Sequence, residues 1–194
     1  MFTVQAANTL AMLDVEKKDI YIRKLDAETG KDIAGAAFVL YRDTVADPNR
    51  IAEWTSDGTP HKLAAGLFSA GTDYYLKEVG APTGYRSTVM IKFRVDSTKK
   101  IVILEGNSNN VNGDRDTLLV RDEPIKLYLR KQNAFGTLLP GAVLKLAEYD
   151  VSQPDQIGTV ILDAYKTDGS VYRVPSAQLK LGTTYILSLI HISE

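Results

Sequence analysis

The chain contains two copies of one sequence pattern, separated by about the length of a small domain. Ile20-Tyr21-Ile22-Arg23-Lys24 recurs as Leu127-Tyr128-Leu129-Arg130-Lys131, and a Gly-Ala pair follows in each copy, at Gly35-Ala36 and at Gly141-Ala142. An internal repeat of this length indicates tandem copies of one folding unit. Both copies place a lysine at the end of an alternating apolar stretch, so that lysine needs its own explanation.

The repeat continues beyond the glycines and ends near residue 187. Ser56-Asp57-Gly58, for example, is matched by Thr167-Asp168-Gly169. Pro124 precedes the second lysine stretch and marks the expected boundary, with almost no linker. We therefore expect a first domain over residues 19–123 and an incomplete second domain over residues 124–187.

Both ends of the chain lie outside the repeat. Residues 1–18 are expected to be either a plain N-terminal arm or the tail of a preceding module. The last eight residues, 187–194, have no counterpart in the first copy, and their sequence is what the transposon mosaic end of sequencing-library adapters would encode. We expect a non-native, adapter-derived tail there, with a genuine strand of alternating apolar residues as the alternative.

Alternating apolar residues and turn residues indicate an all-β fold. Alternation marks residues 20–22, 90–95 and 101–104 as strands, and turns such as Glu28-Thr29-Gly30 and Pro82-Thr83-Gly84 separate such stretches. No long stretch has the 3.6-residue period of a helix. Short strands at this spacing are typical of immunoglobulin-like β-sandwiches, here two in tandem with the second truncated.

The composition argues against several classes of function. The 194 residues carry a formal net charge of −1 with both signs interspersed, which gives no support to nucleic-acid or anionic-membrane binding. The chain has no cysteine, so disulfides, thiolate metal sites and cysteine nucleophiles are excluded. With two histidines, a Ser-His-Asp triad or a histidine metal site is not expected. We expect no cofactor, no metal, no enzymatic turnover and no membrane span.

Three ionisable residues of the first domain fall where they could meet. Lys24 ends the first expected strand, Glu78 lies in Tyr75-Leu76-Lys77-Glu78-Val79, and Asp122 lies on the last expected strand, just before Pro124. First and last strands of a sandwich can be neighbours, so Lys24 and Asp122 could lie side by side inside it. Each residue alone would more often be a solvated surface side chain, so the interpretation depends on all three together.

Taken with Ile33-Ala34-Gly35-Ala36-Ala37-Phe38 and Ala81-Pro82-Thr83-Gly84-Tyr85, these three residues make the first domain resemble a known family. It resembles the Cna B-type (SpaA-like) domains of Gram-positive surface adhesins and pilins. The resemblance covers nearly the whole first domain, and the second copy matches without its glutamate motif.

The resemblance implies an autocatalytic cross-link. The Lys24 amine would form an amide with Asp122 while Glu78 assists; the family more often has Asn at the Asp122 position, so the leaving group changes from ammonia to water. The chemistry is reasonable on its own terms, because burial lowers the pKa of an amine and raises that of a carboxyl. A neutral amine is a nucleophile, and a protonated carboxyl can donate to the carbonyl under attack. Lys131 repeats the lysine without its partners, so we expect it to be unreacted.

The resemblance also implies a function. We expect a structural stalk or spacer in an extracellular, cell-wall-anchored adhesin or pilin-like protein of a Gram-positive bacterium. Its expected partners are neighbouring modules of the same protein, with a host matrix or glycan ligand bound through other domains. Two alternatives stay open: a module that itself binds matrix or glycan, which an exposed aromatic cluster around Trp54 or Tyr85 would favour, and an accessory domain of a secreted carbohydrate-active enzyme.

Overall fold

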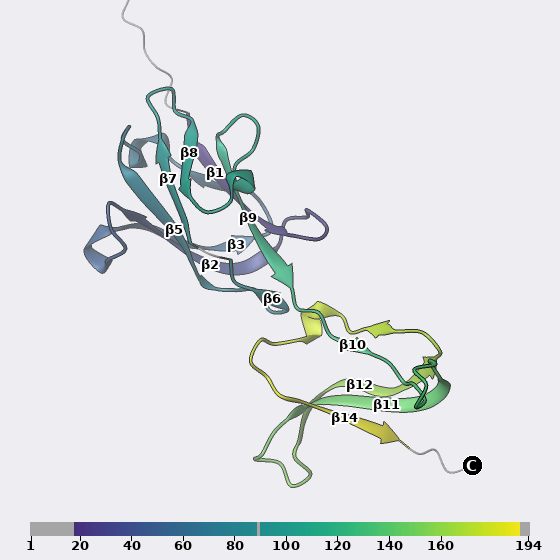
Figure 1. Cartoon of the computed structure of the whole chain (residues 1–194). Coiled ribbons are helices and arrows are strands. Elements are labelled where there is room, and N and C mark those ends of the chain that lie inside the picture. Colours follow the sequence, from purple (N-terminus) through teal and green to yellow (C-terminus); the bar gives the residue numbers. More distant parts are fainter. Residues whose placement is uncertain (1–17, 89, 191–194) are drawn as a thin grey trace, which may run out of the picture.

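The structure is a computed structural model that describes residues 18–88 and 90–190, and its regular structure is almost entirely β, as the sequence predicts. Figure 1 shows two bodies placed end to end, with β9 leading from the first into the second. The expectations for residues 1–17 and 191–194 lie outside the described residues. The helical segments are single 3-10 turns, namely η1 (Asp47–Asn49), η2 (Ala65–Leu67), η3 (Ser108–Asn110) and η4 (Ser176–Gln178).

The first body is a sandwich of two sheets. Its strands are β1 (Ile20–Asp26), β2 (Ala34–Arg42), β3 (Arg50–Asp57), β4 (His61–Leu63), β5 (Asp73–Gly80), β6 (Tyr85–Arg86), β7 (Ile91–Val95), β8 (Ile101–Glu105) and β9 (Thr117–Pro124). One sheet has the order β4-β1-β9-β6 and the other the order β3-β2-β5-β7-β8. The first and last strands, β1 and β9, are neighbours and run parallel. Alternating side chains from both sheets fill the space between them, with Phe38, Tyr74 and Phe93 among the fully buried members.

The second body repeats part of this arrangement. It contains β10 (Tyr128–Leu129), β11 (Pro140–Tyr149), β12 (Ile157–Asp168), β13 (Tyr172–Arg173) and β14 (Tyr185–Ile190). The pair β10-β13 faces a sheet of order β12-β11-β14 across a smaller core that includes Leu129, Leu146 and Leu179. Among residues 125–190, no strand takes the places of β7, β8 and β9. The suspected adapter-derived tail begins inside β14, and its origin stays a prediction.

The sequence repeat is also a structural repeat. The Tyr74 and Tyr185 hydroxyls are equivalent, and each accepts a backbone N–H from the residue five positions earlier at 2.8 Å. The Ser56 and Thr167 hydroxyls each accept, at 3.0 Å, the backbone N–H of the alanine in the repeated Gly-Ala pair. These polar side chains thus fasten connections between strands in the same way in both bodies.

Removal of the Tyr74 hydroxyl is expected to destabilise the first body. The ring is fully buried, and besides accepting the Ser69 N–H the hydroxyl donates to the Leu67 carbonyl at 3.3 Å. Tyr74→Phe leaves both backbone groups without that partner, which costs about 1–3 kcal/mol of unfolding free energy. Denaturant unfolding followed by the fluorescence of Trp54, the single tryptophan, measures the change. Tyr75→Phe, half-buried on the other face of β5, is the control; equal midpoints for the two variants would contradict the assignment.

Candidate functional site

Strand alternation brings Lys24, Glu78 and Asp122 into the core of the first body. In each of their three strands, successive inward positions two residues apart are buried, and the charged residue continues an apolar series. The apolar members of these series are Ile20 and Ile22 on β1, Tyr74 and Leu76 on β5, and Leu118 and Val120 on β9. The period of two that builds the core therefore also buries the three ionisable groups.

The three side chains are in mutual contact. Lys24 Nζ lies 3.0 Å from Glu78 Oε1 and touches Asp122 Oδ1. The exposed fraction is 1% for the lysine side chain and 0% for both carboxyl side chains. Lys24 and Asp122 come from the paired strands β1 and β9, whereas Glu78 comes from the opposite sheet, where it pairs with Phe38. The cluster therefore spans both sheets of the sandwich.

The electrostatics of the cluster make the uncharged form of the Asp122 carboxyl more accessible. Burial raises the pKa of Asp122 to about 6 against the opposing effect of the Lys24 ammonium, and the nearby Glu78 carboxylate also raises it. Lys24 Nζ, Glu78 Oε1 and both Asp122 oxygens make no hydrogen bond of standard geometry within the described residues. Polar atoms in this state are costly in a protein interior. Burial therefore brings the uncharged form of the Asp122 carboxyl closer to neutral pH than in an exposed aspartate.

Other groups around the cluster could not be assigned from the sequence. The backbone N–H of Thr88 donates to Glu78 Oε2 at 2.8 Å, and Lys24 Nζ lies 5.5 Å from the centroid of the Phe38 ring. Thr88 contributes its backbone N–H and not its side chain, so the residue type at this position does not predict the contact. Phe38 belongs to a motif that marks the family resemblance, but its position over the lysine depends on the pairing of β2 with β5.

The second body holds Lys131 without the two carboxyl partners. Lys131 follows β10 and is half-buried, and none of the ion pairs in the described ranges involves it. Leu189 lies opposite Leu144 in β14 and β11, as Glu78 lies opposite Phe38 in β5 and β2. The position of the assisting carboxyl is thus occupied by an apolar side chain.

The aromatic residues considered for glycan binding are used internally. The ring of Trp54 stacks on Phe38 and His61, with centroid distances of 5.3 Å and 4.3 Å, and packs against the core. The Tyr85 hydroxyl donates to Asp26 Oδ2 at 2.8 Å. Both side chains are half-buried and engaged with other residues of the first body, so they do not form the exposed aromatic cluster that would favour a glycan-binding module.

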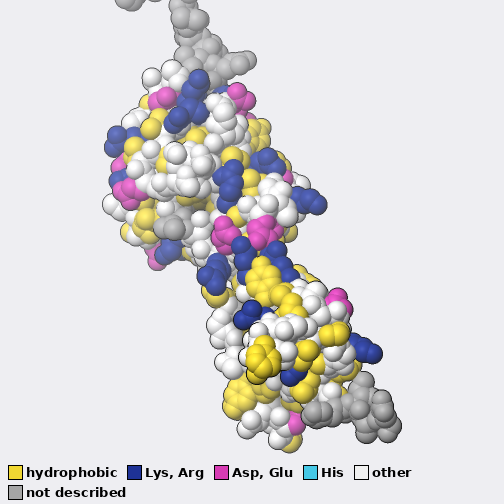
Figure 2. Space-filling view, turned by 45° about the vertical axis from the view of Figure 1, so that its right-hand side comes forward, with side chains coloured by type: hydrophobic (Ala, Val, Ile, Leu, Met, Phe, Trp, Pro, Cys, Tyr) yellow, Lys and Arg dark blue, Asp and Glu magenta, His cyan; other side chains and the backbone are white. Residues whose placement is uncertain are grey.

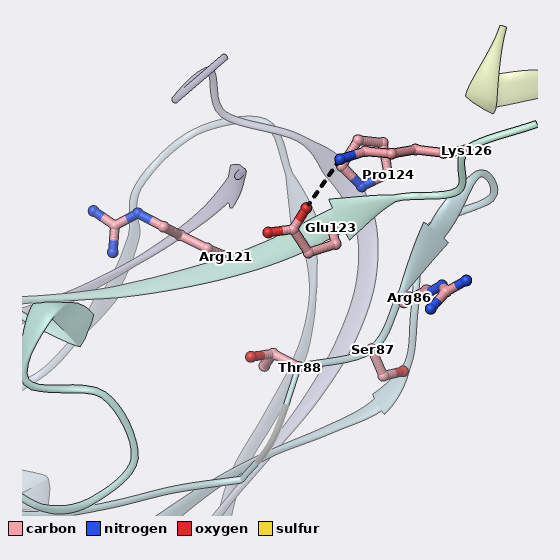
Figure 3. Close-up of a pocket in the computed structure, with 7 residues that line it drawn as sticks. All are labelled: Arg86, Ser87, Thr88, Arg121, Glu123, Pro124 and Lys126. Atoms are coloured by element: carbon pink, nitrogen blue, oxygen red, sulfur yellow. Dashed lines mark ion pairs between the residues drawn. The ribbon is translucent and has the colours of Figure 1, made fainter. Parts of the chain in front are cut away.

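A cavity of about 460 Å³ lies beside the end of β9. Figure 3 shows Arg86 and Arg121 pointing in opposite directions, while Glu123 lies 3.9 Å from Lys126. Because the cations do not converge on one point, the cavity lacks the arrangement of polar groups that orients a bound ligand. Over residues 18–88 and 90–190, no group of three or more metal-ligating side chains gathers, and no helix is long and apolar enough to cross a membrane.

Comparison with known proteins finds a family match for most of the first body. Residues 18–109 match the family described as SpaA, prealbumin-like fold domain. A search of curated proteins finds no match.

Several solved structures are similar to the chain. One is a C-terminal fragment of the pilus adhesin SpaC from Lactobacillus rhamnosus GG, with 18% identity over 91% of this chain and 76% of that one, and a TM-score of 0.45. Another is a variant of the shaft pilin SpaA from the same organism, with 13% identity over 90% and 87% and a TM-score of 0.40. A third is the Bacillus anthracis TIE protein, with 20% identity over 89% and 28% and a TM-score of 0.38.

Proposed function

We propose, from the match of residues 18–109 to the SpaA prealbumin-like fold domains, that the chain is a structural spacer of a Gram-positive surface adhesin or pilin-like protein. We further propose that its first body is closed by an intramolecular amide bond between Lys24 and Asp122, with Glu78 as the assisting acid and base. The observation that carries the proposal is the buried contact of these three side chains.

The bond would form by condensation. A proton passes from the Lys24 ammonium to the Asp122 carboxylate, which leaves a neutral amine and an uncharged, electrophilic acid. The amine nitrogen attacks the carboxyl carbon of Asp122, and the Glu78 carboxylate takes a proton from the nitrogen and donates it to the hydroxyl oxygen that leaves. That oxygen departs as water, and Glu78 ends as the carboxylate that it was at the start. The product is one amide and one water molecule, so the reaction happens once and is not enzymatic turnover.

Three features of the site support this chemistry. The reacting groups are already held in contact, which supplies the effective concentration that free amide formation lacks. The raised pKa of Asp122 makes its uncharged, electrophilic form accessible near neutral pH. Lys24 Nζ, Glu78 Oε1 and both Asp122 oxygens, which make no regular hydrogen bond in the described part of the chain, are atoms that an amide bond would consume or re-pair.

The position of the bond suits a spacer. β1 enters the first body and β9 leaves it, and the two strands run parallel and side by side. Tension applied to the two ends of the body would therefore act on this strand pair. An amide between Lys24 and Asp122 would carry that load directly and bypass most of the residues between them. It would also resist reduction, in keeping with a chain that has no cysteine.

Intact-mass measurement tests the proposal. The purified chain is expected to be lighter than its sequence mass by one water molecule, and fragmentation should find Lys24 joined to Asp122. Lys24→Ala should have its full calculated mass, because the nucleophile is absent. Lys131→Ala, which removes the repeated lysine of the second body, is the matched control and should keep the deficit. A full-mass parent chain would refute the bond.

Asp122→Asn gives an independent check on the leaving group. The asparagine variant would lose ammonia instead of water, and its cross-linked product would be the same molecule as the cross-linked parent. The two proteins should therefore have equal masses although their sequences differ. A mass difference between their products would show that residue 122 is not the acyl donor.

A further inference from the structure

The two bodies meet at a charged contact around Glu28. This residue lies in the turn after β1, and its Oε1 is 2.9 Å from Lys126 Nζ while its Oε2 is 2.7 Å from Arg173 Nη2. Both cations lie beyond β9, in the second body. Figure 2 shows acidic and basic side chains gathered at the narrowing between the two bodies. One carboxylate of the first body is thus shared by two cations of the second.

A backbone contact accompanies the charged one. Gly84 has a φ of +88°, and a Cβ added to it would lie 2.6 Å from the carbonyl carbon of Ser176 in η4. Real Cβ atoms do not approach another backbone so closely, so only glycine allows this packing. The Gly84 carbonyl also accepts the N–H of Ile125 at 2.7 Å, which ties the start of the second body to the first.

The first body holds these contact groups in a fixed position. Asp26 Oδ1 accepts the backbone N–H groups of Glu28 and Thr29 at 2.7 Å and 2.8 Å, and Asp26 Oδ2 accepts the Tyr85 hydroxyl proton at 2.8 Å. Tyr85 is next to Gly84 in the chain. One carboxylate therefore links the turn that carries Glu28 to the turn that carries Gly84, and the docking surface is preorganised.

The repeat shows that the pairing of two cations at this surface is specific to the second body, because the first body has one cation and one carboxylate at the equivalent positions. The pairing of Tyr128 with Arg173 in β10 and β13 corresponds to that of Tyr21 with Lys62 in β1 and β4. In the first body, Lys62 is paired at 2.6 Å with Asp19, the residue that stands where the second body has Lys126. At the equivalent surface of the first body, the lysine is therefore neutralised by a carboxylate of the same body. The second body instead presents two cations that take their carboxylate from its neighbour.

We propose that this contact is a specific docking interface that fixes the orientation of the second body on the first. Its parts are the carboxylate of Glu28 between Lys126 and Arg173, and the close approach of Gly84 to Ser176. The partner that the cationic surface fits is a preceding module with a carboxylate and a glycine turn in this arrangement. The interface does not depend on the amide bond, since none of its groups takes part in that reaction.

Distance measurement between two spin labels tests the interface in the full chain. The chain has no cysteine, so Ser97→Cys between β7 and β8 and Gln153→Cys between β11 and β12, both exposed, provide two unique label sites, one on each body. The parent pair is expected to give one narrow distance peak. Gly84→Ala should abolish the narrow peak through the clash with Ser176, and Glu28→Lys should abolish it through repulsion.

Matched variants separate docking from general damage. Gly71→Ala places alanine at a similar φ of +81° with no atom within 4 Å, and Glu53→Lys reverses an exposed charge away from the joint; both should keep the narrow peak. Exchanging charges in Glu28→Lys with Arg173→Glu should restore it. Trp54 unfolding curves and intact mass show whether each variant is folded and cross-linked. A broad distribution in the parent, or a narrow unshifted one in both Gly84→Ala and Glu28→Lys, would overturn the proposal.

Discussion

Glu78→Gln is expected to lower the unfolding free energy of the first body by roughly 4–5 kcal/mol, the value for a cross-link that closes a loop of about 100 residues. Glutamine has nearly the shape of glutamate but cannot take up and return the protons that the condensation needs. Lys24 and Asp122 would then stay in contact as a buried ion pair without forming the amide. The unfolded chain would regain the freedom that the bond removes, which is the main source of the lost stability.

Two measurements on the same samples decide this prediction. Intact mass should show that Glu78→Gln lacks the loss of one water, and denaturant unfolding followed by Trp54 fluorescence should give the lower stability. The fluorescence reports on the first body alone, because Trp54 is the single tryptophan and packs against its core. Glu53→Gln, an exposed carboxyl on β3, should change neither quantity. A Glu78→Gln protein that retains the water loss would show that Glu78 is not the assisting residue.

The all-β fold and the meeting of the three ionisable residues follow from one property of the sequence. Apolar residues alternate along β1, β5 and β9, and a period of two also fixes which face each charged residue occupies. Lys24 and Asp122 fall in phase with buried neighbours, so the sequence predicts that both point inward. Their contact also depends on the first and last strands being neighbours in one sheet, an arrangement that is common in sandwiches.

The joint between the bodies could not be predicted in the same way. Glu28 and Arg173 belong to different copies of the repeat, and no period or motif relates them. Gly84 is recognisable as a turn glycine, but its approach to Ser176 depends on how the second body is placed. The alternation pattern describes one sheet at a time, whereas these contacts depend on the relative position of two folded bodies.

Lys24→Ala is expected to make the stability of the first body strongly dependent on pH. Removing the ammonium leaves the Asp122 and Glu78 carboxyls together in the core without the cation that contacts both. Burial already raises the pKa of Asp122 from 3.8 to about 6 with Lys24 present, and loss of the ammonium removes an effect that lowers it. The folded-state pKa thus lies above the unfolded one, so the protonated carboxyl is the form that the folded core favours.

Because the folded pKa of Asp122 lies above the unfolded pKa, the stability of Lys24→Ala should fall as the pH rises. The stabilisation is fully present below the unfolded pKa near 4 and is lost as the pH rises through the folded value, near 6 or above. A shift of about two pKa units corresponds to on the order of 3 kcal/mol in full, so Lys24→Ala should be less stable by roughly 2–3 kcal/mol at pH 8 than at pH 4. Trp54-monitored unfolding across this pH range measures the change in stability, with Lys77→Ala, an exposed lysine on β5, as control.

The cross-linked parent has no free carboxyl at residue 122, so this component of its pH dependence should be absent. Stability of Lys24→Ala that stays level or rises between pH 4 and pH 8, relative to Lys77→Ala, would mean that Asp122 is ionised in the folded core, and the condensation would then lack its neutral acid.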